Sequence, residues 1–208
     1  GYGYYQPENG YNPFSEYANR FNQRKQLTFS GDAKLSYEIT KGLIASVFGS
    51  YQRNSWDDRY YRSTQDYQQY NSGSPYFGTG YAYKGSHLDF TQTVEPTITY
   101  STEIAEHSFE LLGGYSYQYS ATENYSMDNS GFTTDGFEDW NFGAGNAITD
   151  IDLPRPNMSS FKEDNTLIAY FTRLSYNYLD RYFLQASVRH EGSSRFGANN
   201  KWASFPAI

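Results

Sequence analysis

The chain has 208 residues, a formal net charge of −7 and no cysteine. The absence of cysteine excludes disulfides, thiolate metal sites and a cysteine nucleophile. The acidic balance argues against a nucleic acid partner, because binding to phosphates needs a basic surface. Aromatic residues make up 20% of the chain, with 23 tyrosines among them. Tyrosine suits half-buried strands and membrane interfaces.

No apolar run approaches the roughly 18 residues of a transmembrane helix. Residues 1–5 show neither the basic nor the apolar region of a signal peptide, and there is no initiator methionine. We therefore expect an excerpt of a longer protein or a processed chain.

Period-two alternation is strongest over residues 25–39. The odd positions are apolar or small: Leu27, Phe29, Gly31, Ala33, Leu35, Tyr37 and Ile39. The even positions are polar: Gln26, Thr28, Ser30, Asp32, Lys34, Ser36 and Glu38. This strand is longer than the usual five or six residues and could cross a bilayer, which takes about 9–11 residues.

Five further strands are predicted after this one. They lie near 43–55, 86–101, 107–120, 165–178 and 181–191. Pro96 indicates a bulge, because proline cannot donate a ladder hydrogen bond. Short turns join the two strands of each hairpin, whereas the connections between hairpins are long. The predicted long loops lie near 56–85, 121–164 and 192–208.

Short turns at one end of the strands and long loops at the other are typical of bacterial outer-membrane barrels, with the long loops outside the cell. We therefore predict an all-β fold, a segment of antiparallel up-and-down transmembrane β-barrel with about six long strands. The alternative is a soluble or surface-attached β-sheet module for carbohydrate binding or adhesion. The odd face of residues 27–39 separates the two, because only the module buries it under a second layer.

The most specific stretch is Arg173–Pro206. It contains Tyr176-Asn177-Tyr178, then Asp180-Arg181-Tyr182, then Glu191-Gly192-Ser193-Ser194-Arg195-Phe196-Gly197, with Trp202 and Phe205-Pro206 after them. This order closely resembles the barrel of SusC/RagA-type TonB-dependent outer-membrane transporters of Bacteroidetes. The strong match covers about a sixth of the chain, and the order of the strands fits the rest.

The resemblance implies a barrel of about 22 strands with a plugged lumen, in the outer membrane. It also implies energy input from TonB, a SusD-like surface lipoprotein as partner, and uptake of oligosaccharides, glycans or peptides. The chain shows no plug domain and no TonB box, and about six strands are too few to close a barrel. We therefore expect a mid-barrel fragment, whose lumen-facing residues line the path or hold the plug. These are Asp32, Lys34, Glu38, Glu110, Gln185 and Arg189.

The residues shared with the family have structural explanations. Asp180 and Arg181, followed by Tyr182, fit a tight periplasmic turn, where aspartate bonds backbone amides and arginine pairs with a carboxylate. Gly192 indicates the point where a strand leaves the membrane, ahead of Ser193 and Ser194. Arg195, next to Phe196, is expected to form an inward salt bridge or to anchor a loop, with a direct contact to substrate as the alternative.

Catalysis is not expected. The chain has no nucleophile elbow, HExxH or serine–histidine–aspartate spacing, and adjacent carboxylates on a strand face opposite sides. The pairs Asp57/Asp58 and Glu138/Asp139 are therefore predicted to be solvated loop charges. Residues 128–131 and 150–152 offer oxygen ligands for calcium but lack the closing glutamate of an EF-hand. No cofactor or metal is predicted.

Ligand contact is the function that the loops favour. Aromatic side chains alternate there with hydrogen-bonding ones, which suits sugar rings and also peptides. The alternative is that these aromatic side chains pack the loops onto one another or onto a lid protein. The candidate ligand-binding residues are Trp56, Asp57, Arg59, Tyr60, Tyr76, Phe137 and Trp140.

Overall fold

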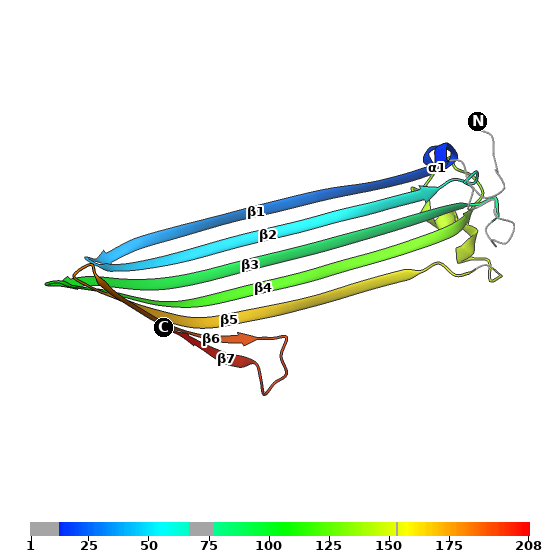
Figure 1. Cartoon of the computed structure of the whole chain (residues 1–208). Helices are drawn as coiled ribbons and strands as arrows, with labels where there is room; N and C mark the ends of the chain where they lie inside the picture. The colour runs from blue at the N-terminus through cyan, green and yellow to red at the C-terminus, as the bar shows by residue number, and fades with distance from the viewer. Residues whose placement is uncertain (1–12, 67–76, 153) are drawn as a thin grey trace. The chain divides into compact units, whose positions relative to one another are not determined.

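The computed structural model describes residues 13–66, 77–152 and 154–208. They form one seven-stranded sheet whose strands follow chain order (Figure 1). The strands are β1 (Arg20–Thr40), β2 (Leu43–Arg62), β3 (Gly80–Ile104), β4 (His107–Phe132), β5 (Met158–Tyr178), β6 (Tyr182–Ser193) and β7 (Trp202–Ala207). The short helix α1 (Pro13–Asn19) precedes β1, and two 3-10 turns, η2 (Phe142–Ala144) and η3 (Asn146–Ile148), lie between β4 and β5.

The predicted all-β up-and-down class is confirmed, but several predicted boundaries differ. A seventh strand, β7, lies where only a loop was predicted, and α1 was not predicted at all. Strands also occupy both ends of the two other predicted loops. β2 continues to Arg62 and β4 to Phe132, while β3 begins at Gly80 and β5 at Met158. None of the described helices is long and apolar enough to span a membrane.

The extended strand ends carry polar residues at both odd and even positions, which explains why the alternation did not reveal them. In β2, Asp57 and Asp58 are adjacent and face opposite sides of the sheet. Apolar alternation marks a strand only where one face is withdrawn from water. The backbone ladder needs no such pattern, so a strand continues wherever its neighbour still supplies donors and acceptors.

The described residues divide into two compact units, to both of which β1–β5 contribute. The first unit takes the described residues up to Leu27, those from Ser55 to Leu88, and Glu123–Lys162. The second unit takes Thr28–Asn54, Asp89–Thr122 and Glu163–Ile208. The second unit therefore contains the short turns, and the first contains the long connections.

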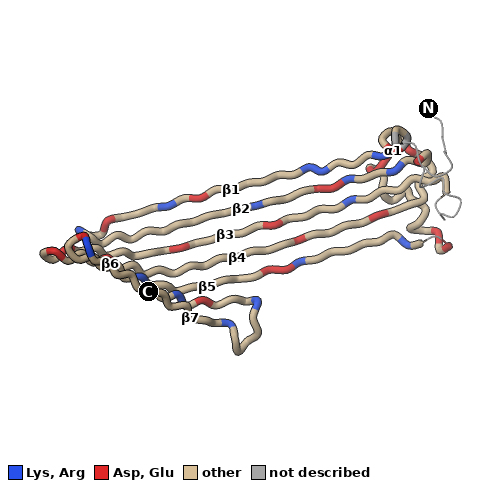
Figure 2. Tube along the Cα trace, in the orientation of Figure 1, with Lys and Arg blue, Asp and Glu red and all other residues tan. Residues whose placement is uncertain are grey.

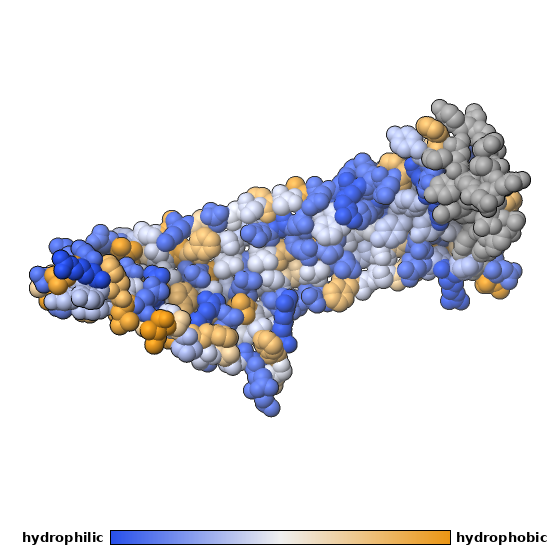
Figure 3. Space-filling model, viewed as in Figure 1, coloured by the Kyte–Doolittle hydropathy of each residue, from blue (hydrophilic) through white to orange (hydrophobic). Residues whose placement is uncertain are grey.

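In the second unit, the apolar positions of β1 are exposed. Leu35 and Tyr37 have 72% and 73% of their surface accessible. No described residue forms a second layer over this face, so the condition that a soluble module requires is not met. Exposed apolar side chains in a regular row suit contact with lipid. Figure 3 shows hydrophilic and hydrophobic residues interspersed on the face in view.

Aromatic rings form cross-strand pairs on the same unit. Tyr170 of β5 lies 5.2 Å from Tyr115 of β4, and Phe109 lies 5.0 Å from Tyr176, both measured between ring centroids. Cross-strand aromatic pairs of this kind each stabilise a sheet by roughly 0.2–1 kcal/mol. They give the sheet side-chain packing in the absence of a second layer.

The first unit has a small core of its own. Tyr61, Ala82 and Phe132 are buried together, and Phe21 and Phe142 pack against them. Tyr61 meets Phe132 edge to face, with ring centroids 6.0 Å apart. Since Phe142 belongs to η2, this core joins the connection between β4 and β5 to the strand ends.

Basic and acidic residues also recur along β1 and β2 (Figure 2).

Candidate functional site

The pairing of β1 with β2 assigns the side chains of the first unit to two faces. Arg24 donates from Nε and Nη2 to the two carboxylate oxygens of Asp58, at 2.6 and 2.8 Å. Further along the same strands, Thr28 bonds Asn54 and Ser36 bonds Ser46, which keeps one constant register. Even positions of β1 and β2 therefore share the polar face, and odd positions share the other.

Trp56, on the even face, is enclosed by two neighbours. The imidazole of His87 stacks on its indole with centroids 3.9 Å apart and planes 12° apart. The guanidinium of Arg24 lies 5.3 Å from the indole centroid. Because β1 and β3 flank β2, these partners approach from opposite sides. Trp56 therefore has no bare ring face on which a sugar could stack.

An open cavity of about 490 Å³ lies beside this stack on the even face. It is lined by Asn22, Arg24, Asp58, Tyr60, Arg62, Tyr81 and Tyr83. Tyr60 and Tyr81 meet edge to face, with centroids 6.0 Å apart, and the Arg62 guanidinium lies 4.6 Å from the Tyr81 ring centroid. The volume falls in the range of small-molecule sites, about 300–1,000 Å³. This cavity is the candidate ligand site.

The odd face carries a buried ion pair between a strand and the β4–β5 connection. Arg59 donates from Nε and Nη2 to the carboxylate of Asp139, at 2.6 and 2.5 Å, and the Lys84 ammonium lies 3.4 Å from the same group. The Asp139 side chain is completely inaccessible to solvent. The Arg59 guanidinium also lies 3.8 Å from the ring centroid of Trp140. A bidentate pair stacked on an aromatic ring holds one geometry.

The surroundings of Asp139 keep its carboxylate charged. Burial would raise the pKa of this carboxyl, but the hydrogen bonds and positive charge of Arg59, together with the charge of Lys84, outweigh that effect. The pKa of Asp139 is therefore held below its ordinary value. The expectation that Asp139 is a solvated loop charge is wrong. Arg59 of β2 and Lys84 of β3 attract its carboxylate, which is buried against the strands.

Two further polar side chains attach the β4–β5 connection to the strands. Asp135 accepts hydrogen bonds from the Tyr61 hydroxyl and from the backbone and hydroxyl of Thr64, each at 2.8 Å. Buried Asn129 donates from Nδ2 to the carbonyls of Phe142 and Gly145, at 2.8 and 3.1 Å. Buried polar groups that are satisfied in this way rigidify a loop. The connection is an ordered cap on the odd face.

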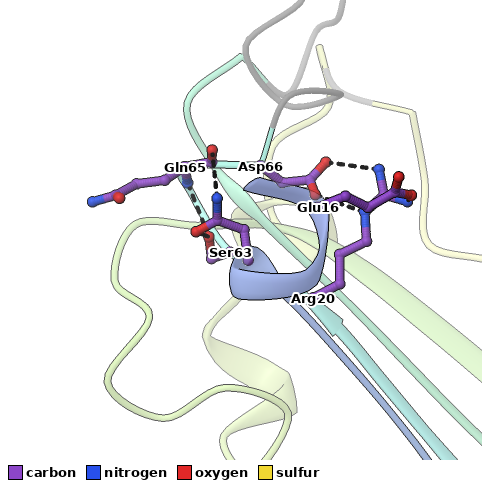
Figure 4. A network of polar contacts seen from close by, with 6 residues as sticks. Glu16, Arg20, Ser63, Gln65 and Asp66 are labelled. Atoms are coloured by element: carbon purple, nitrogen blue, oxygen red, sulfur yellow. Dashed lines mark hydrogen bonds and ion pairs between the residues drawn. The ribbon is translucent and has the colours of Figure 1, made fainter. Parts of the chain in front are cut away.

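A polar network fastens α1 to the end of β2 (Figure 4). Arg20 bonds Glu16 of α1 and also reaches the buried carboxylate of Asp66, at 2.7 Å from its Nε. The hydroxyl of Ser63 donates to the Asn19 side chain, and the Ser63 backbone amide donates to the Asn19 carbonyl at 2.9 Å. These contacts fix the start of β1 beside the end of β2, next to the candidate ligand site.

The predicted ligand residues do not form a single site. Trp56 and Tyr60 lie on the even face, whereas Asp57 and Arg59 lie on the odd face. Trp140 joins Arg59 through the stacking contact, and Phe137 is exposed on the same connection. Tyr76 lies outside the described residues. Arg24 and Tyr81 were missed as members of the polar face, although they lie on strands that pair with β2, at positions on the same face as Trp56.

Residues of the family motif occupy a turn and a strand contact in the second unit. Leu179 and Asp180 have φ values of 56° and 52°, and Asn177 donates to the Asp180 carboxylate at 2.5 Å. Gly192 pairs with Trp202 across β6 and β7. Both contacts are made with neighbouring residues of the fold, and the structural role of these positions stays a prediction.

Four further motif residues, Ser193–Phe196, lie at the end of β6 and the start of the β6–β7 turn. Ser194 exchanges two hydrogen bonds with Thr166: its backbone amide donates to the Thr166 carbonyl, and its hydroxyl accepts from the Thr166 amide. Ser193 accepts from the backbone amides of Arg195 and Phe196. Arg195 is exposed and forms no ion pair with any described residue, so the inward salt bridge is not seen there, whereas the other expected role, anchoring a loop, stays a prediction.

Among the described residues, no three histidine, aspartate or glutamate side chains converge on one point. Asp128 accepts hydrogen bonds from the Asn157 amide at 2.8 Å and from the Tyr81 hydroxyl at 3.5 Å. The Asp150 carboxylate accepts from the backbone amide of Asp152 at 3.0 Å. These oxygen-rich segments thus carry local hydrogen bonds.

The chain is similar to curated receptors over nearly its whole length. It is 28% identical over 198 residues to TonB-dependent receptor P3 of Formosa agariphila and 30% identical over 208 residues to TonB-dependent receptor P26 of the same organism. It is 24% identical over 211 residues to TonB-dependent receptor SusC of Bacteroides thetaiotaomicron. These alignments cover 94–97% of the chain but only 18–19% of each relative.

Solved structures show the same fold. A chain of the RagAB peptide transporter superposes with a TM-score of 0.82 and 18% identity, covering 98% of this chain and 22% of that one. The open-open state of the RagAB peptide importer gives a TM-score of 0.80 with 19% identity, at the same coverage of both chains. No family model matches the sequence.

Proposed function

We propose a transport role for this chain, which is a segment of outer-membrane β-barrel wall related to SusC/RagA-type TonB-dependent receptors. One observation carries the proposal. The strands of the second unit expose apolar side chains on one face and polar side chains on the other, as a wall between lipid and an aqueous lumen requires. The relatives named above are receptors of the same membrane.

In this role, the polar face lines the path of the imported molecule. Two ion pairs lie on it: Arg173 of β5 with Glu110 of β4, at 3.2 Å, and Arg189 with Glu191 within β6, at 2.5 Å. Because a cation and an anion lie side by side in each pair, such a wall can face water or a plug without strongly attracting either cations or anions. The long connections of the first unit stand at the mouth, where cargo is captured.

The cargo proposed is an oligosaccharide, a glycan or a peptide. A SusD-like lipoprotein is the proposed partner at the outer mouth, and TonB the proposed source of energy. Two similarities support these partners: one relative is itself named SusC, and the matching structures are those of a peptide transporter with two named components. The surface-module alternative gains no support, because it needs a covered apolar face.

The proposal is tested with the full-length protein that contains this segment. The gene is deleted, and uptake of fluorescent oligosaccharides and peptides is compared with uptake in cells that lack TonB. We expect the two strains to lose uptake of the same cargo, and re-expression to restore it in the gene-deletion strain. Unchanged uptake of every cargo in the deletion strain would rule out the transport role.

A further inference from the structure

The residues that line the cavity on the even face include more cations than anions, and Asp128, outside the lining, accepts from the Tyr81 hydroxyl. The charged lining residues are Arg24, Arg62 and Asp58, so cations exceed anions by one although the whole chain carries −7. Three tyrosine rings complete most of the wall. An excess of positive charge in a concave site favours anionic ligands, because low-dielectric walls concentrate the electric field of the charged groups there.

Arg24 has donors to spare for a ligand. Its bidentate pair with Asp58 uses one N–H on each of Nε and Nη2, and a guanidinium offers five N–H groups in all. The Arg24 side chain is more than half exposed to solvent. A second oxyanion can therefore bind this arginine without breaking the ion pair, in the planar geometry that suits carboxylates and sulfates.

The other lining groups suit a sugar better than a peptide. None of the lining residues is aliphatic, so the cavity offers no pocket for apolar peptide side chains. The tyrosine rings present flat surfaces with hydroxyl tips. Asp58 and Asn22 add acceptors, and Asn22 adds donors, for ring hydroxyls.

We propose that this cavity binds the anionic group of an acidic sugar residue, a carboxylate or a sulfate. The inference rests on the proposed transport function and narrows its cargo to acidic glycans. Arg24 and Arg62 hold the anion, while Tyr60, Tyr81 and Tyr83 contact the ring. On β1 and β2, the residues that line the cavity are all even-numbered, the parity of the polar face.

The test uses the full-length protein in detergent and an array of neutral hexose oligomers, uronate oligomers, sulfated oligomers and short peptides. We expect binding to concentrate on the uronate or the sulfated oligomers. For a uronate that binds, the matched probe is its methyl ester, which removes the charge and keeps the ring. The ester should bind about ten- to a hundredfold more weakly, the factor expected for one or two charge-assisted hydrogen bonds.

Two variants assign that preference to the cavity. The double variant Arg24→Gln/Asp58→Asn removes the cation without leaving a lone carboxylate, and Arg62→Gln removes the second cation. Each should reduce the preference for the charged oligomer over its neutral counterpart by about tenfold. The matched control is Arg53→Gln, which removes an exposed arginine from the odd face of the same strand and should keep the preference.

The outcomes separate this inference from the transport role. Binding confined to neutral oligomers or to peptides would overturn the acidic-sugar assignment and leave transport standing. An acid preference that survives both cavity variants would also overturn it, because another site must then hold the anion. Loss of binding to every oligomer and peptide, together with unchanged uptake on gene deletion, would remove the transport role as well.

Discussion

Gly192 shows how one residue fixes the contact between β6 and β7. It lies opposite Trp202 in the ladder, and a Cβ added at this position would fall 2.7 Å from two atoms of the indole. The indole stacks on His190 with centroids 5.0 Å apart and planes 10° apart. The missing side chain thus creates the space in which the tryptophan lies flat across the strand.

Substituting Gly192→Ala should destabilise the barrel by about 1–3 kcal/mol, the usual range for overpacking. The measurement is the temperature at which the full-length protein loses the electrophoretic mobility of a folded barrel. Gly197→Ala is the control, because nothing lies within 4 Å of its added Cβ. In the double variant Gly192→Ala/Trp202→Ala, the penalty from the added methyl should largely vanish. An equal penalty with and without the indole would contradict this account.

The ion pair of Asp139 makes a prediction about acid. Because its folded-state pKa lies below the ordinary value of 3.8, its contribution is fully present above that value and is lost as pH falls through the folded pKa. The β4–β5 connection should therefore stay ordered from neutral pH to about pH 5 and loosen only below about pH 4. In Asp139→Asn it should be loose throughout, because Arg59 loses its charged partner.

A spin label can report this change. Gly143 has open space around it, so a cysteine placed there carries the label without a clash, and the chain has no other cysteine. Label mobility in wild-type protein and in Asp139→Asn is then recorded between pH 8 and pH 3. In the wild-type protein the mobility should be constant at the start of this titration, near neutral pH. Mobility that rises already between pH 8 and pH 5 in wild type would show that another group holds the loop.

At the scale of the element, a strand could be predicted from the sequence only where one of its faces is withdrawn from water. The alternating stretches around Leu35 and Leu111 marked their strands clearly, and the short turns fell where expected. The strand ends near Arg59 and Lys84 were invisible, since polar residues occur on both faces there. Their order comes from pairs such as Arg24 with Asp58, which link residues far apart in sequence. A single sequence shows neither the register nor the pairing.

The same reason explains how much of the candidate site could be predicted. Aromatic and charged residues on β2 drew attention to Trp56 and Arg59, but alternation sends these two to opposite faces. The partners that decide their roles, His87 and Asp139, lie on other elements. Composition therefore indicated the region of the site, and only the pairing of strands separated the ligand face from the loop anchor.

The β5–β6 turn places two residues in the left-handed region, Leu179 at φ 56° and Asp180 at φ 52°. For leucine this conformation costs roughly 1–2 kcal/mol relative to the right-handed region. Hairpins with both central residues at positive φ favour asparagine or glycine there. The turn nevertheless keeps its hydrogen bonds, with the Leu179 amide donating to the Glu106 carbonyl of the neighbouring turn at 3.0 Å.

Leu179→Asn should therefore stabilise the barrel, by about 1 kcal/mol or slightly less. The assay is again the temperature at which folded electrophoretic mobility is lost, which should rise. Leu174→Asn is the contrasting variant: Leu174 lies within β5 on the exposed apolar face, and the temperature should fall. A decrease with Leu179→Asn would mean that the leucine contributes packing that outweighs its strained backbone.

At the scale of the whole molecule, the seven strands of the described residues leave two edges without a partner strand among those residues. β1 presents an edge of 21 residues with exposed apolar side chains at alternate positions, and β7 is a short edge of six residues. Unpaired backbone groups on an exposed edge pair readily with other chains, and in lipid they cannot be satisfied at all. A polypeptide made only of these 208 residues is therefore expected to self-associate.

Sedimentation of that polypeptide, refolded from urea into buffer without detergent, tests this expectation. It should sediment as β-rich aggregate, because the unpaired backbone edge of β1 and its exposed apolar face both associate with other copies of the chain. Lys and Glu placed alternately on the edge at Leu27, Phe29, Leu35 and Tyr37 should increase the monomeric fraction, since charge on an edge blocks pairing. The same number of changes on the even face, which is already polar, serves as the control. A monodisperse monomer of the unmodified polypeptide would show that the sheet closes its own edges, and the barrel-wall interpretation would then have to be abandoned.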